Sequence, residues 1–215
     1  MKDFGGQTAY WGGVGAVKTF THPVHHGWLE EVSTHARILD YGCGYGRVVA
    51  ELNDRGFSDV AGVDPSPALI ERGRKLRPDL RLSVLESPPD LACASAAFDA
   101  VLLFAVLTCI PDDEAQQAVV AELRRVLPPG GLLYVSDLVL QGDRRNRDRY
   151  AAHTQQFHTP YGVFATDDGA VLRHHDLAHL HSLLSGFDLV RERTIEVATM
   201  NGHRSTAVQL LARKR

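Results

Sequence analysis

A turn with glycine at every second position places the strongest constraint on this chain. The turn lies in the stretch Ile38-Leu39-Asp40-Tyr41-Gly42-Cys43-Gly44-Tyr45-Gly46, where residues 37–41 predict a buried strand and a helix is expected to begin near Tyr45. Glycine adopts positive φ and lets a ligand lie against bare backbone, while the first N–H groups of a helix lack partners within the helix. The turn therefore predicts a nucleotide-type ligand, with unpaired N–H groups directed at it.

The spacing of the glycines distinguishes two kinds of cofactor. A dinucleotide fingerprint is G-x-G-x-x-G, whose third glycine admits the pyrophosphate against the helix. Here Arg47 occupies that position, and the third glycine, Gly46, comes one residue earlier. An NAD-dependent oxidoreductase is therefore a disfavoured alternative. The D-x-G-C-G-x-G pattern instead resembles motif I of the class I S-adenosylmethionine-dependent methyltransferases, whose cofactor carries no pyrophosphate.

A carboxylate at the end of the next predicted strand, residues 59–64, supports the nucleotide reading. Asp64 follows Gly42 by 64 − 42 = 22 residues, close to the roughly 20 expected for an acid that binds ribose hydroxyls. Asp64 could instead cap the following helix. Ser66, with Pro67 at the first helical position, already fits that role and leaves Asp64 free.

The resemblance extends over residues 36–138 and implies further cofactor contacts. The F-D-x-V strand 98–104 and the P-P-G-G entrance to the strand 132–137 are similar to family features, and an acid after the third strand (80–85) commonly binds the adenine amino group. In this family the segment before the first helix often covers the methionine end of the cofactor, although the arm could equally pack on the surface. The expected cofactor-binding residues are Asp40, Gly42, Cys43, Gly44, Gly46, Asp64, Pro65, Glu86, Ser87, Phe104 and Ala105, with Tyr10 and Thr21 from the N-terminal arm.

The order of predicted elements indicates a single α/β domain. We expect a Rossmann-like, seven-stranded sheet, mostly parallel with an antiparallel last strand and helices on both faces. The runs 187–199 and 205–212 read as its last two strands, and the turn 200–203 between them should lie on the same edge as the glycine turn. The expected parts are an N-terminal cover with a short helix from His25 to Ser33 (1–35), a cofactor-binding core (36–138), a substrate-cover insertion with a polar helix and a small hairpin (141–175), and a C-terminal helix and hairpin (176–215).

Methyl transfer has no single catalytic motif that could be identified in the sequence. Methyl transfer from a sulfonium is an in-line displacement that needs alignment and exclusion of water, with a base only if the nucleophile arrives protonated. Several histidines fall in expected cover segments, including His22, and we select His174 and His203 as candidate bases; each could also be a structural or solvent-exposed histidine. The candidate substrate contacts are Leu107, Tyr161, Arg173, Met200 and Asn201.

Composition and charge exclude other classes of protein. The net charge of −3 and the pI near 6.4 do not fit a nucleic-acid footprint, and no run approaches the ~20 apolar residues of a membrane span. The start, residues 1–6, lacks the apolar core of a signal peptide, so we expect a cytoplasmic monomer or homodimer. The three cysteines form no C-x-x-C pair, and His22/His26 and His175/His179 have helical metal spacing without a third ligand, so no metal is expected.

These observations predict an enzyme that transfers a methyl group from S-adenosylmethionine to a small molecule. The chain resembles small stand-alone bacterial methyltransferases of unassigned substrate. Two alternatives remain: an enzyme of the same fold that uses the cofactor for other chemistry such as cyclisation, and a non-catalytic module that binds S-adenosylmethionine.

Overall fold

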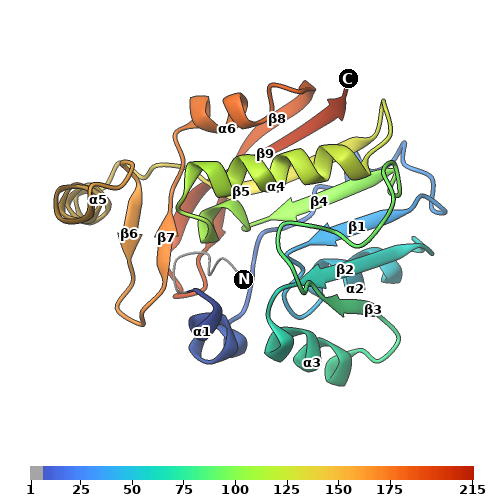
Figure 1. The fold of residues 1–215 in the computed structure, drawn as a ribbon, viewed down its shortest axis with the longest axis horizontal. Helices are drawn as coiled ribbons and strands as arrows, with labels where there is room; N and C mark the ends of the chain where they lie inside the picture. Colours follow the sequence, from blue (N-terminus) through green and yellow to red (C-terminus); the bar gives the residue numbers. More distant parts are fainter. Residues whose placement is uncertain (1–6) are drawn as a thin grey trace.

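A seven-stranded sheet forms the centre of the structure, a computed structural model that describes residues 7–215 (Figure 1). The strand order is β3-β2-β1-β4-β5-β9-β8; the first five strands are parallel, and β9 runs antiparallel to both β5 and β8. The predicted Rossmann-like sheet is confirmed, whereas the prediction about residues 1–6 lies outside the described residues. The strands are β1 (Ile38–Tyr41), β2 (Val60–Asp64), β3 (Arg81–Val84), β4 (Ala100–Phe104), β5 (Leu132–Leu138), β8 (Phe187–Ala198) and β9 (Arg204–Lys214).

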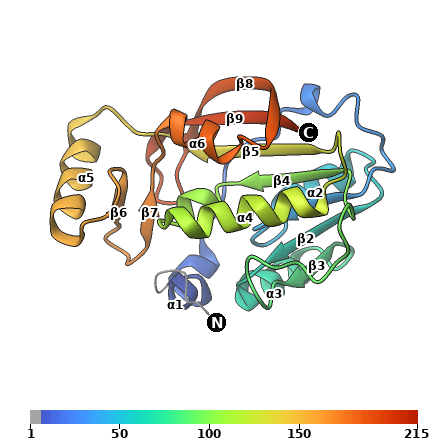
Figure 2. The same ribbon diagram turned by 45° about the horizontal axis from the view of Figure 1, so that its top comes forward.

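Helices cover both faces of the sheet (Figures 1 and 2). On one face, α4 (Asp113–Val126) and α6 (Leu177–Leu183) bury residues such as Leu123 and Leu180 against the sheet. On the other face, α2 (Arg47–Asp54) and α3 (Pro67–Leu76) contribute to a second core cluster. Successive strand residues face opposite sides of the sheet. Because helices cover both sides, β1 and β4 are buried along their whole length. Their continuous apolar runs follow from this double burial.

Short polar side chains cap the starts of three helices, and the cap by Ser66 was predicted from the sequence. Ser66 accepts from the N–H of Leu69 at the start of α3, and Asp112 accepts from the N–H of Ala115 at 2.8 Å at the start of α4. Asp176 caps α6 in the same way.

Two predicted helices differ from the structure. The helix after the glycine turn begins at Arg47 rather than near Tyr45, because Gly46, at φ +80°, is the residue that caps it. The predicted helix from His25 to Ser33 is only a single 3-10 turn, η2 (His26–Trp28), followed by further turns. Its Gly27 disfavours a longer helix, and Leu29 nevertheless packs into the core under β1.

The insertion after β5 forms a lobe beside the sheet, at the left of Figure 1. It contains the polar helix α5 (Arg144–Phe157) and the hairpin of β6 (Val163–Ala165) and β7 (Val171–Arg173), both as predicted. The N-terminal arm, with α1 (Gln7–Gly12) and η1 (Val14–Val17), packs against this lobe, because Tyr10, Tyr150 and Phe164 share one apolar cluster. The arm and the insertion therefore enclose the space beyond the sheet edge together.

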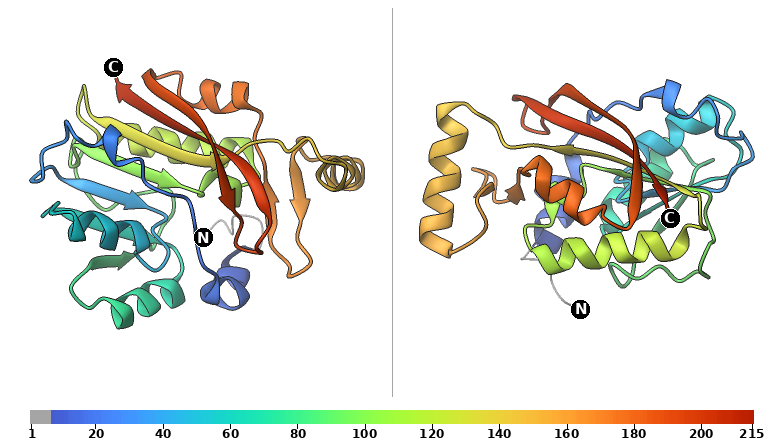
Figure 3. Two further views of the ribbon diagram at one scale, coloured as in Figure 1. Left: turned by 180° about the vertical axis from the view of Figure 1, so that it is seen from behind. Right: turned by 90° about the horizontal axis from the view of Figure 1, so that it is seen from above.

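The turn between β8 and β9 lies at the same edge of the sheet as the glycine turn, as predicted from the parallel direction of β8 (Figure 3). In open α/β sheets, ligands bind outside the carboxyl ends of the strands at the point where the strand order reverses. That point here lies between β1 and β4. Within residues 7–215, no helix combines the length and the apolar character needed to cross a bilayer.

Candidate active site

A cavity of about 300 Å³ opens at the carboxyl ends of β1, β2 and β4. The glycine turn forms its floor, and the N-terminal arm contributes Trp11 and Phe20 to its cover. We call it the cofactor cavity because most of the residues predicted to bind a cofactor line it. These are Asp40, Gly42, Cys43, Gly44, Asp64, Pro65, Glu86, Phe104 and Ala105.

The conformation of the turn requires glycine at all three positions. Gly42, Gly44 and Gly46 have φ values of +74°, +57° and +80°, a region that side chains with a Cβ adopt at a cost. A Cβ on Gly44 would lie 2.6 Å from Cε2 of Phe20, and one on Gly42 would lie 2.3 Å from Cγ2 of Val106. The backbone of the turn therefore lies too close to Phe20 and Val106 to leave room for a side chain at Gly44 or Gly42.

Four N–H groups of this turn, which precede the first N–H groups of α2, are paired within the chain. Gly42 and Cys43 both donate to the carbonyl of Val63, and Gly44 donates to Asp64 at 2.9 Å. Gly46 donates to the carbonyl of Cys43. A pyrophosphate needs free donors, so these four N–H groups are not available to one.

The cofactor cavity instead offers carboxylate acceptors. Asp64 accepts from the N–H groups of Gly44 at 2.9 Å and Ser66 at 2.8 Å, and burial raises its pKa to about 6. Asp40 is 2% exposed, and its Oδ2 has no hydrogen-bond partner among the described residues. Burial raises the pKa of Asp40 to about 7, against the opposing charge of Arg47. A buried acceptor without a partner is costly, so the cavity suits a ligand that carries hydroxyl, amino or ammonium donors.

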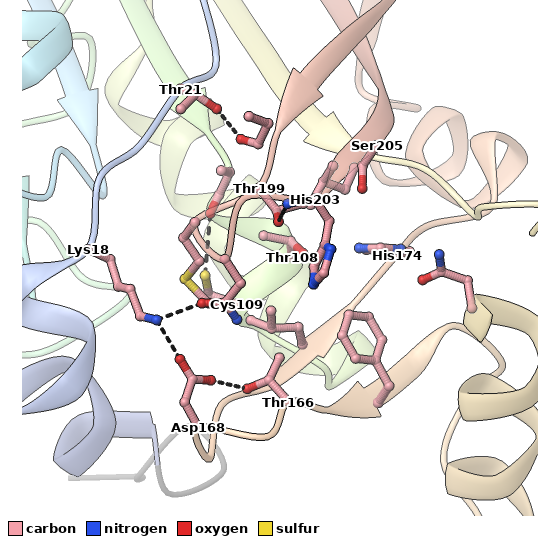
Figure 4. A pocket seen from close by; sticks show the side chains of 18 of the residues that line it. Lys18, Thr21, Thr108, Cys109, Thr166, Asp168, His174, Thr199, His203 and Ser205 are labelled. Carbon is pink, nitrogen blue, oxygen red and sulfur yellow. Dashed lines mark hydrogen bonds and ion pairs between the residues drawn. The ribbon is translucent and has the colours of Figure 1, made fainter.

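A larger cavity of about 690 Å³ lies beside the first (Figure 4). Its walls come from α5, the β6–β7 hairpin, the N-terminal arm and the turn between β8 and β9. Six residues predicted as site residues line it. These are Thr21, Ala105, His174, Met200, Asn201 and His203.

The two cavities meet at a shared wall. Five residues line both of them, from the N-terminal arm and from the segment after β4: Trp11, Phe20, His22, Ala105 and Cys109. The two cavities therefore adjoin along these five residues. Of the five, only Ala105 is a predicted site residue.

His22 was not selected from the sequence and is the titratable ring at the junction. It is 6% exposed, and its Nδ1 lies 2.9 Å from Oγ of Ser136. Burial, with the charge of Arg47, lowers the pKa of His22 to about 4, so the ring is neutral near pH 7. Its position before Pro23 in an aromatic arm is the sequence signal that could have identified it.

His174 and His203 differ in their surroundings although both project toward the larger cavity (Figure 4). His174 is 2% exposed, and its Nδ1 lies 2.5 Å from the hydroxyl of Tyr150. Burial lowers the pKa of His174 to about 3. His203 lies in the turn between β8 and β9 and is exposed. As expected for neighbouring residues of an extended segment, His175 faces away, toward Asp137.

Three predicted substrate contacts lie outside the walls of both cavities. The fully buried Leu107 belongs to the core under α4. Tyr161 is 49% exposed and packs its ring edge-on against Tyr150. The guanidinium of Arg173 is turned into the protein, where it pairs with Asp113 and donates to the carbonyl of Pro111 at 3.1 Å.

Three predicted cofactor contacts also lie outside the walls. The hydroxyl of Tyr10 lies 3.2 Å from Oδ2 of Asp168 and ties the arm to the β6–β7 hairpin. Gly46 serves as the cap residue of α2, and Ser87 lies in a loop where its carbonyl accepts from Asp90. In the part of the chain that the structure describes, no group of three or more His, Cys, Asp or Glu residues could hold a metal ion.

Part of this chain is similar in sequence to known methyltransferases. Residues 39–135 match the family model described as a methyltransferase domain. Human methyltransferase-like protein 27 is 39% identical over 100 residues, which cover 46% of this chain and 39% of that protein. The chain thus matches only about two fifths of that relative's length.

Two solved structures share the fold. A SAM-dependent methyltransferase from Methanosarcina mazei superposes with a TM-score of 0.82 at 23% identity, covering 89% of this chain and 98% of that one. The 1,6-didemethyltoxoflavin N1-methyltransferase from Burkholderia thailandensis, solved with 1,6-didemethyltoxoflavin and S-adenosylhomocysteine, has a TM-score of 0.66 at 20% identity and covers 99% of this chain and 85% of that one. The methyltransferase-domain model over residues 39–135 and the shared fold together support a relationship of this chain to the class I S-adenosylmethionine-dependent methyltransferases.

Proposed function

We propose that this protein transfers a methyl group from S-adenosylmethionine to a small-molecule nucleophile. The observation that carries the proposal is the junction: a cavity lined by acceptors and a larger cavity share a wall of five residues. The bound cofactor supplies a methyl group already activated by its sulfonium, so the protein mainly aligns the two partners and excludes water. The small-molecule complex of the Burkholderia thailandensis neighbour supports this substrate class by analogy.

The acceptors of the cofactor cavity match the donors of this cofactor. In our proposal, Asp64 accepts from the ribose hydroxyls, Glu86 binds the adenine amino group, and the unpartnered Oδ2 of Asp40 accepts from the ammonium of the methionine part. Gly42 and Gly44 let the turn pass close to Val106 and Phe20, which line the same cavity. Pro65, Phe104 and Ala105 supply apolar contact, with Cys43 beside the turn.

The N-terminal arm contributes to the cover of both cavities, and the insertion 141–175 adds to the cover of the larger one. Trp11 and Phe20 take the role predicted for Tyr10, because they line the cofactor cavity while the hydroxyl of Tyr10 bonds to Asp168 and holds the arm in place. Thr21, Met200 and Asn201 face the acceptor side. His203 is our candidate base for an acceptor that arrives protonated, since it lines the larger cavity and is open to solvent.

Calorimetric titration with S-adenosylmethionine, S-adenosylhomocysteine and NAD tests the cofactor. We expect the first two to bind and NAD not to bind; binding of NAD alone would overturn the assignment. Incubation with methyl-labelled cofactor and a metabolite extract then tests the reaction. Transfer of label to a small molecule is expected, whereas cofactor binding without any methylated product would favour cyclisation-type chemistry or a binding module.

A further inference from the structure

The charges in the wall of the larger cavity are unevenly paired. Lys18 is neutralised, because its Nζ lies 2.6 Å from Oδ2 of Asp168. Asp143 lies in the same wall, but its carboxylate caps α5 by accepting from the N–H of Asn146 at 3.1 Å. Three arginines of the wall have no ion pair within residues 7–215: Arg145, Arg149 and Arg204. With the exposed Asp167 included, the wall holds four cationic side chains and three carboxylates, which leaves one net positive charge.

Arg149 is the unpaired arginine that is partly enclosed. Its guanidinium carbon lies 3.4 Å from the ring centroid of Phe164, and its Nε is shielded from solvent without a hydrogen-bond partner. Burial lowers the pKa of Arg149. Phe164 covers one face of the guanidinium, so the donors at its edge are what remain for a ligand. An enclosed cation without an anion is costly, and a planar anionic group that accepts two of its hydrogen bonds would remove that cost.

His174 supplies a second donor in the same wall. Gln141 donates its N–H to the hydroxyl of Tyr150 at 3.4 Å, so the single proton of that hydroxyl is free for an acceptor. The nearer acceptor is Nδ1 of His174 at 2.5 Å; Oδ1 of Asn146 lies at 3.3 Å. We assign the hydroxyl proton to the bond with His174, so the neutral ring carries its own proton on Nε2. His174 then presents an N–H donor, which suits an anion or a polarised oxygen.

We propose that the methyl acceptor is a small organic anion whose carboxylate or phosphate group binds at the edge of Arg149, with Nε2 of His174 as a further donor. This inference rests on the proposed methyl transfer and names the substrate class for the larger cavity. The exposed Arg145 and Arg204 attract the anion to the mouth of the cavity, where solvent screens them.

Fractionation of the metabolite extract by anion exchange tests the charge of the acceptor. At about pH 8, where carboxylates and phosphates are ionised, we expect the compound that gains label to come from the retained fraction. Phosphatase treatment of that fraction distinguishes the sources, because acceptor activity survives it only for a carboxylate. An acceptor in the unretained fraction overturns this inference and leaves methyl transfer standing. Absence of label in every fraction, with cofactor binding intact, overturns both.

Variants of Arg149 test the residue with the acceptor so identified. Replacing Arg149 with Gln should raise the KM for the acceptor by about 10- to 100-fold, the loss of a charge-assisted contact, while the Kd for S-adenosylmethionine by calorimetry stays unchanged. Replacing Arg149 with Lys should restore part of the KM. Arg147→Gln is the matched control, since Arg147 is exposed on the same helix outside the cavity wall. An unchanged KM in a folded Arg149→Gln variant overturns the assignment.

Discussion

The hydroxyl of Tyr150 lies 2.5 Å from Nδ1 of His174, and this contact determines what His174 can offer a substrate. A ring whose Nδ1 accepts from Tyr150 carries its proton on Nε2 and is a donor rather than a base. Burial reinforces this role, because it lowers the pKa of His174 to about 3 and keeps the ring neutral at physiological pH. His174 was predicted from the sequence to act as a base, whereas this contact makes its ring a hydrogen-bond donor. A variant of His174 can distinguish the two roles.

Replacing His174 with Gln provides that separation. A Gln side chain retains an N–H donor but cannot act as a base, so we expect kcat/KM for the acceptor to fall by less than about tenfold, with the shape of the pH profile unchanged. Steady-state kinetics across the pH range is the measurement. A loss of about 100-fold or more, with disappearance of the acidic limb of the profile, would instead identify His174 as the base.

Asp64 should govern affinity for the cofactor. Replacing Asp64 with Ala removes the ribose acceptor and leaves the N–H groups of Gly44 and Ser66 without their partner. We expect cofactor binding to weaken by about 1–3 kcal/mol, measured by calorimetry. Asp59→Asn is the control, because Asp59 directly precedes β2 at the end opposite Asp64 and lines neither cavity. Unchanged affinity in a folded Asp64→Ala variant would contradict the ribose role.

The raised pKa of Asp64 also predicts a pH dependence of binding. In the free protein burial raises this pKa to about 6, so the carboxylate form that accepts hydroxyl donors dominates only above that pH. Affinity for S-adenosylmethionine should therefore fall on acidification below about pH 6, by up to about tenfold per pH unit for this one group. The comparison with Asp64→Asn isolates the effect, since that variant should lose this part of the slope. Equal slopes in the two proteins would assign the dependence to another group, such as Asp40.

Local patterns in the sequence were sufficient for the sheet and for most helix starts. Asp112 and Asp176 lie within three residues of the N–H groups that they cap. Contacts between residues so close in the chain can be predicted from a short sequence pattern. The glycine turn and Asp64 could be identified for the same reason, because their spacing follows from one βαβ unit. The antiparallel pairing of the last two strands was predicted from the short connection between them.

Long-range packing accounts for the parts of the site that the sequence did not reveal. Arg173 was expected to face the substrate but pairs with Asp113, a partner 60 residues away that no local pattern indicates. Trp11, Phe20 and His22 reach the junction only because the arm folds over the sheet edge. The donors of the glycine turn are paired with Val63 and Asp64 of the neighbouring strand, a consequence of strand order rather than of the turn's own sequence.

Lys18 should hold the N-terminal arm closed over the site. Its Nζ lies 2.6 Å from Oδ2 of Asp168 and 2.6 Å from Oδ1 of Asn201, and so joins the arm to both the hairpin and the β8–β9 turn (Figure 4). Replacing Lys18 with Met should speed cofactor dissociation by about three- to tenfold, since a pair of this exposure contributes about 1 kcal/mol. Stopped-flow dissociation is the measurement, with Lys75→Met, which breaks an exposed pair on α3, as the control. Identical dissociation rates in Lys18→Met and the unmodified protein would rule out this closing role.

Gly44 allows a matched test of how closely the turn approaches its cover. Gly44 and Gly56 both have positive φ, at +57° and +90°, so replacement by Ala should strain either backbone by about 1–2 kcal/mol. A Cβ on Gly56 meets nothing within 4 Å, whereas a Cβ on Gly44 would lie 2.6 Å from the Phe20 ring that lines both cavities.

The two Ala variants should therefore lose similar stability but differ in binding. Urea unfolding of each should show a comparable loss in the free energy of unfolding, with any excess for Gly44→Ala arising from displacement of Phe20. Calorimetry should show an unchanged Kd for S-adenosylmethionine in Gly56→Ala and a Kd at least about tenfold higher in Gly44→Ala, because Phe20 must move into the space where the cofactor binds. If Gly44→Ala instead binds the cofactor as tightly as Gly56→Ala, displacement of Phe20 does not narrow the space that the cofactor occupies, and the cofactor must bind in a part of the cavity away from Phe20.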